Sequence, residues 1–234
     1  MLNLATAQKI DFFAACFEQG MEFLENNDID QAILSFGEAI RYNSEDFAAW
    51  FHMGCAMEKK GLLDSALLAY KQALHLNPQE HTAWFHLGKL YSKKQEGDSA
   101  IEAYRQAVHF KPDFDAAWHQ IGDEFWRMND MDHAMNAYET ALQINSENDG
   151  VWCSLGHAAQ EMDDLDNAFF AFKKAALIQP NQFTALFALS TLFAQINRKP
   201  EAKSYLRRCQ KLDPIQCHER LQQEPALLAI VDTL

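Results

Sequence analysis

Histidine and cysteine are the side chains of this sequence best suited to metal binding or nucleophilic chemistry. His52 and His86 are 34 residues apart, and His119 follows 33 residues later. On neighbouring helices packed about 8–10 Å apart, two such imidazoles can approach one metal ion. A structural zinc site needs four ligands, and no cysteine or carboxylate spacing supplies the others. The sequence therefore favours solvated or ligand-facing histidines, and we expect no metal and no cofactor.

Cys153 and His157 are four residues apart, a spacing that brings two side chains together on one helical face. A cysteine nucleophile also needs an orienting group and an oxyanion site, and the sequence offers neither. The adjacent Asp163 and Asp164 fall between helical segments, where acidic residues cap helices and carry solvated charge. No glycine-rich phosphate loop follows a strand. We therefore expect no catalytic residue and no enzymatic activity.

The elements that position these residues are set by a pattern that recurs every 34 residues without insertion or deletion. It places a large residue at position 4, glycine at 8, alanine at 20, an aromatic at 24, alanine at 27 and proline at 32. Two clear copies are Trp50, Gly54, Ala66, Tyr70, Ala73, Pro78 and Trp84, Gly88, Ala100, Tyr104, Ala107, Pro112. Six units cover residues 13–216, as 13–46, 47–80, 81–114, 115–148, 149–182 and 183–216. The sixth unit has lost the tryptophan and the glycine.

This pattern resembles the signature of the tetratricopeptide repeat (TPR) family. The resemblance implies an all-α solenoid of six helix-turn-helix repeats in a right-handed superhelix, whose first helices line the concave face. A single repeat cannot bury its apolar face alone, so we expect residues 1–234 to form one domain.

The repeated small residues predict where the two helices of a unit approach each other. Glycine inside a helix costs about 1 kcal/mol relative to alanine, so its recurrence indicates a steric need. The tryptophans are expected to fill the space between neighbouring repeats. An aspartate at the start of the second helix is expected to cap it. These aspartates are Asp30, Asp64, Asp98, Asp132 and Asp166.

The two ends of the array are expected to differ in structure. Residues 1–12 are expected to extend the first helix or fray. Residues 217–234 are expected to form a C-terminal cap, with a polar helix over 217–223 and an apolar segment over 226–231. That apolar segment has two interpretations: it folds back on repeat six, or it enters a groove or joins a second copy.

First-helix positions that face away from the core form the predicted peptide-binding groove. Its residues are Phe17, Phe51, His52, Cys55, Phe85, His86, Lys89, Lys93, His119, Gln120, Asp123, Arg127 and His157. Its three phenylalanines either form an exposed apolar binding patch or pack sideways between adjacent first helices as core. The cations Lys59, Lys93 and Arg127 either complement helix dipoles or meet acidic ligand groups.

Composition narrows the possible partners. The net charge of -13 disfavours nucleic acid. No apolar run is long enough to span a membrane, and no secretory signal opens the chain. Five cysteines, an odd number without a paired motif, favour reduced thiols and a cytoplasmic location.

These observations predict a non-catalytic protein–protein interaction scaffold, an adaptor or chaperone, that binds a peptide or protein segment. One subclass of the family grips C-terminal carboxylates with Lys and Asn. Phe17, Met21, Phe51 and Cys55 occupy those positions here, so that clamp is not expected. Two alternatives stay open: a self-associating scaffold or homodimer that uses the C-terminal segment, and a regulatory subunit of an enzyme complex.

Overall fold

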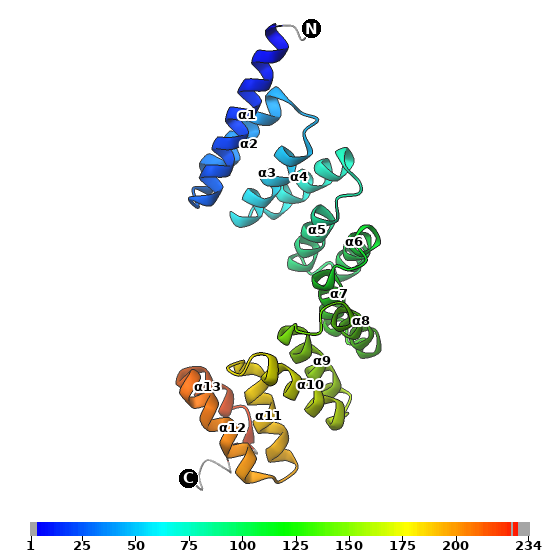
Figure 1. The fold of residues 1–234 in the computed structure, drawn as a ribbon, viewed down its shortest axis with the longest axis vertical. Coiled ribbons are helices and arrows are strands. Elements are labelled where there is room, and N and C mark those ends of the chain that lie inside the picture. Colours follow the sequence, from blue (N-terminus) through cyan, green and yellow to red (C-terminus); the bar gives the residue numbers. More distant parts are fainter. Residues whose placement is uncertain (1–3, 226, 229–234) are drawn as a thin grey trace. The chain divides into compact units, whose positions relative to one another are not determined.

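The computed structural model describes residues 4–225, 227 and 228, and this part of the chain is helical with short connections (Figure 1). Helix pairs recur at the predicted 34-residue spacing, which confirms the all-α repeat architecture. The helices are α1 (Leu4–Glu25), α2 (Ile29–Tyr42), α3 (Phe47–Lys59), α4 (Leu63–Leu76), α5 (His81–Lys93), α6 (Gly97–Phe110), α7 (Asp115–Arg127), α8 (Met131–Ile144), α9 (Asp149–Glu161), α10 (Leu165–Ile178), α11 (Phe183–Gln195), α12 (Lys199–Leu212) and α13 (Pro214–Leu221).

The helices group into two compact units, Met1–Ala117 and Trp118–Leu234, hereafter the first and second unit. The boundary falls inside α7. Within each unit, the two helices of a repeat pack on each other, and the second helix packs on the first helix of the next repeat. That the whole array unfolds as one domain stays a prediction.

The conserved spacing of the glycines has a specific steric cause. A Cβ atom on Gly54 would lie 2.8 Å from the ring of Tyr70, and one on Gly88 would lie 2.5 Å from the ring of Tyr104. The buried aromatic at position 24 therefore occupies the space that a side chain at position 8 would need. The close approach is between helix backbone and ring, rather than between two helix backbones.

Three of the tryptophans at position 4 also close the loop before their helix. The indole N–H donates a hydrogen bond to the carbonyl oxygen six residues earlier, at 2.8–2.9 Å. The pairs are Trp50 with Ser44, Trp84 with Pro78, and Trp152 with Ser146. The ring therefore fixes the loop geometry as well as packing at the junction between repeats.

The predicted aspartate caps do not form: at three helices the cap lies two residues earlier, at Asp28, Asp130 and Asp164, and α4 and α6 have no side-chain cap bond. Asp28 is the N-cap of α2, and its side chain accepts a hydrogen bond from the amide of Gln31. Asp30 lies in the first turn instead, where its Oδ1 is 2.5 Å from Nζ of Lys60 in the next repeat. The recurring aspartates therefore complement the helix dipole from the first turn, and Asp30 and Asp64 also link repeats through Lys60 and Lys94.

The two ends of the array extend it in different ways. At the start, α1 begins at Leu4, so residues 4–12 lengthen the first helix. At the end, α13 begins at Pro214, three residues before the predicted start. Asp213 causes this shift, because it is both the C-cap of α12 and the N-cap of α13.

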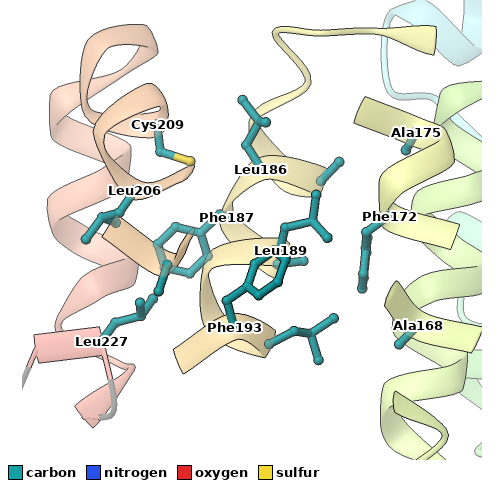
Figure 2. Close-up of a cluster of buried hydrophobic side chains, with 14 of the residues drawn as sticks. Ala168, Phe172, Ala175, Leu186, Phe187, Leu189, Phe193, Leu206, Cys209 and Leu227 are labelled. Atoms are coloured by element: carbon teal, nitrogen blue, oxygen red, sulfur yellow. The ribbon is translucent and has the colours of Figure 1, made fainter. Parts of the chain in front are cut away.

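The described part of the C-terminal segment folds back on repeat six. Cys217, Leu221 and Leu227 are buried in one cluster with Phe187 and Leu206. Figure 2 shows Leu227, Leu206 and Phe187 of this cluster. This packing supports the cap interpretation for the segment up to residue 228. Residues 226 and 229–234 of the predicted apolar segment lie outside the described residues.

Candidate interaction site

In the first unit, phenylalanines at position 5 link the first helices of successive repeats. The ring of Phe17 lies 5.7 Å from Phe36 of its own repeat and 5.7 Å from His52 of the next repeat. Phe51 continues the pattern, 5.8 Å from Tyr70. We name the continuous series Phe17, His52, Phe51, His86 and Phe85 the aromatic ladder.

Each ring of the aromatic ladder is partly buried and keeps part of its surface exposed. At the far end, Phe85 packs on Tyr104 at 5.6 Å and on Phe114 at 4.9 Å. Nζ of Lys89 lies 6.0 Å from the centre of the Phe85 ring. No ion pair of Lys89 with a carboxylate is found among the described residues. The ladder therefore ends beside an available cation.

A carboxylate that the sequence analysis missed lies beside the ladder. Glu58 accepts hydrogen bonds from Tyr70 Oη at 2.9 Å and Lys93 Nζ at 2.5 Å, and His86 Nδ1 lies 3.4 Å away. Its side chain is only 9% exposed. Burial alone would raise the pKa of the Glu58 carboxyl, but hydrogen bonds from His86, Lys93 and Tyr70 outweigh burial and lower it from 4.5 to about 2. Lys93 is therefore already paired within the protein.

Burial also changes the ionisation of two predicted groove residues near Glu58. It lowers the pKa of His52, so this imidazole is neutral at pH 7. It raises the pKa of the Cys55 thiol, whose sulfur lies 3.4 Å from the hydroxyl oxygen of Tyr70. The described residues contain no group of three or more His, Cys, Asp or Glu that could hold a metal ion.

The second unit carries a polar counterpart on its first helices. Asp123 accepts hydrogen bonds from Tyr138 Oη and Gln120 Nε2, both at 2.9 Å. Nε2 of His119 lies 3.0 Å from Oγ of Ser154 in the next repeat. Burial raises the pKa of Asp123, against the lowering effect of His119 and Tyr138. Hydrogen bonds here replace the ring contacts of the aromatic ladder.

Two further predicted groove residues in the second unit have internal partners. Arg127 pairs with Glu124, a carboxylate that is 1% exposed. His157 packs edge-on against Phe172 at 4.9 Å, and burial lowers its pKa. It also lines a polar cavity of about 500 Å³ with Arg220. The cation of Arg127 is therefore engaged inside the protein, as Lys93 is.

The predicted groove thus divides between the units. Eight residues lie in the first unit: Phe17, Phe51, His52, Cys55, Phe85, His86, Lys89 and Lys93. Five lie in the second unit: His119, Gln120, Asp123, Arg127 and His157.

The cysteine considered as a nucleophile is a buried thiol. Cys153 is 6% exposed, and burial raises its pKa to about 12. At neutral pH the thiol stays protonated, and the thiolate is the form that reacts.

The repeated helix pairs, their glycine-to-ring packing and the first-helix ladder define a tetratricopeptide repeat protein. The model of one such family, the cilia and flagella-associated protein 70 C-terminal domain, matches residues 8–231. The chain belongs to this family. A search of curated proteins found no match.

Solved structures share the fold at low sequence identity. PilF of Pseudomonas aeruginosa has a TM-score of 0.77 at 15% identity, covering 93% of this chain and 99% of that protein. A tetratricopeptide repeat protein from Parabacteroides merdae has a TM-score of 0.72 at 16% identity, covering 94% and 84%. YrrB, described as having an unusual peptide-binding site, has a TM-score of 0.64 at 18% identity, covering 85% and 98%.

No helix in the described part of the chain is long and apolar enough to cross a membrane.

Proposed function

We propose that this chain is a non-catalytic scaffold that binds a segment of another protein along the aromatic ladder. The observation that carries the proposal is the unbroken series of partly exposed rings on α1, α3 and α5. A contiguous apolar surface of this kind is typical of protein interaction sites. YrrB, which has the same fold, is described as binding peptide. A cytoplasmic location belongs to the same proposal, supported by the odd number of cysteines.

The ion pairs within the protein limit which cations can contact a ligand. Lys93 and Arg127 are held by Glu58 and Glu124, which leaves Lys89 as the cation beside the rings. The preferred ligand therefore presents apolar side chains to the ladder and an acidic group near Lys89. Binding does not require the C-terminal segment, whose Leu227 is buried within repeat six.

Affinity capture from a lysate of the source cells tests the proposal. The wild type is compared with Phe51→Ala/Phe85→Ala and with Lys89→Glu, each shown by circular dichroism to be folded. The matched control is Leu34→Ala/Leu68→Ala, which removes two exposed leucines from second helices. We expect both ladder variants to lose a protein that the wild type and the control retain. Equal retention by all four proteins contradicts the proposal.

A further inference from the structure

Successive repeats meet through one recurring junction. In the junction of repeats two and three, Leu63 and Leu67, at positions 17 and 21, pack in a cluster with Ala83, Leu87 and Leu90 of the next first helix. Those three residues stand at positions 3, 7 and 10. The residues at positions 17 and 21 are also apolar and packed at three other junctions: Ile29 and Ile33, Met131 and Met135, and Leu165 and Phe169. Each junction therefore has a second-helix half and a first-helix half.

The first-helix half is open at the start of the array, where it is polar. Positions 3, 7 and 10 of repeat one are Ala15, Gln19 and Glu22, and all three are exposed. The equivalent residues at positions 3 and 10 of the later repeats are almost fully buried. Asp11 and Glu18 lie on the same face of α1, because offsets of 7 and 11 residues return to one side of a helix. We name Asp11, Glu18 and Glu22 the acidic stripe.

At the end of the array α13 covers part of the second-helix half, and the part that stays exposed is basic. Positions 17 and 21 of repeat six are Lys199 and Lys203, in place of the apolar pair. Arg207 and Lys211 continue the series at four-residue spacing along α12. We name these four residues the basic stripe. Lys199, Arg207 and Lys211 are exposed, and α13 packs beside them on Leu206.

The positive charge of this end contrasts with the rest of the chain. Residues 198–220 hold seven of the twenty lysines and arginines but only three of the thirty-three acidic residues. A solvated end needs only polar residues, and either sign of charge supplies them. The two ends of the array also carry charges of opposite sign. The acidic stripe on α1 and the basic stripe on α12 are therefore complementary in charge. They also stand at the positions through which neighbouring repeats contact each other.

We propose that the basic stripe is a docking surface for the acidic stripe of a second copy of this chain. Helix α12 of one copy packs against α1 of the next copy beside its own α13, which already covers Leu206 and Cys209. Charge pairs replace the apolar contacts of the inner junctions. The contact is head-to-tail, so a dimer still presents one acidic stripe and one basic stripe at its two ends, and assembly continues beyond a dimer unless the copies close into a ring.

Sedimentation velocity of the chain over a range of concentrations tests the proposal at about 50 mM and about 500 mM salt. We expect dimers and larger species at low salt, and at least roughly tenfold weaker association at high salt, because exposed charge pairs are screened. Lys199→Glu/Arg207→Glu is expected to abolish association, and so is Glu18→Lys/Glu22→Lys. Mixing these two variants is expected to restore association, because each then offers a complementary stripe to the other.

The control is Lys173→Glu/Lys174→Glu, which makes the same change in net charge on exposed residues of α10. We expect this control to associate like the wild type. A monomer at every concentration in low salt overturns the proposal. So does association that survives Lys199→Glu/Arg207→Glu, or that the control loses equally. If the wild type is monomeric while the stripe retains an acidic protein from lysate, the stripe serves a different partner and the self-association is refuted.

Discussion

Replacing Glu58 by glutamine removes the charge that three groups stabilise at the junction of repeats two and three. The carboxyl pKa falls from 4.5 to about 2 in the folded chain. At about 1.4 kcal/mol per pKa unit, this difference corresponds to about 3 kcal/mol. Lys93 is 47% exposed, so water screens part of the interaction. We therefore expect Glu58→Gln to lower the free energy of unfolding by about 2 kcal/mol at pH 7.

The stability difference between Glu58→Gln and the wild type is expected to depend on pH. A carboxyl whose pKa is depressed on folding contributes stability above its unfolded pKa of 4.5, and this stability is lost as pH falls towards about 2. Urea unfolding of both proteins between pH 7 and pH 3 measures the difference. We expect it to be constant above about pH 5.5 and to shrink by about half at pH 3.

Glu45→Gln is the matched control, because Glu45 is exposed and no ion pair of its side chain is found among the described residues. We expect the control to unfold like the wild type at each pH. A Glu58→Gln variant as stable as the wild type at pH 7 would refute the reasoning. A deficit that stays constant down to pH 3 would refute it equally, because the effect would then not come from the charge.

Three other substitutions or probes test the packing. Gly88→Ala should destabilise by about 1–3 kcal/mol, because the added Cβ meets a buried ring at 2.5 Å, whereas Gly37→Ala, with open space around it, should stabilise slightly in thermal melts. Leu227→Ala should cost about 2–5 kcal/mol if the described C-terminal segment is a cap, while Leu177→Ala, 74% exposed, should be nearly neutral. Burial raises the pKa of Cys209 to about 12, so this thiol should resist an aromatic disulfide reagent at pH 8 until the chain is unfolded. Rapid reaction in the native protein would contradict the buried placement.

The 34-residue repeat period is enough to predict most of the fold. Fixed spacing marked Gly54 as a position of close approach between the two helices of a repeat, but the group that approaches it is the ring of Tyr70 rather than the backbone of the second helix. Helix boundaries were less predictable, because the caps depend on loop geometry. Asp28 caps α2 although the recurring aspartate is Asp30. Asp213 serves two helices at once and so moves the start of α13.

The polar contacts of the site were harder to predict from sequence. The cations at position 13 were visible as a series, but their partners do not recur. Lys93 pairs with Glu58 of the preceding repeat, whereas Arg127 pairs with Glu124 of its own helix. Such pairing depends on side-chain rotamers and burial at one junction. The groove phenylalanines were identified from their position, while their contacts with histidines of the next repeat required the packing of adjacent helices.

Site-specific photo-cross-linking tests the central claim most directly. A benzophenone amino acid is placed at the position of Phe85 on the aromatic ladder, or at the position of Leu68 on a second helix, where the native side chain is 68% exposed. Both proteins are irradiated in lysate of the source cells. The account predicts a discrete cross-linked protein from the Phe85 position that is absent from the Leu68 position and is lost with Lys89→Glu. Cross-linking from the Leu68 position alone would contradict the account, because the partner would then bind the second-helix face.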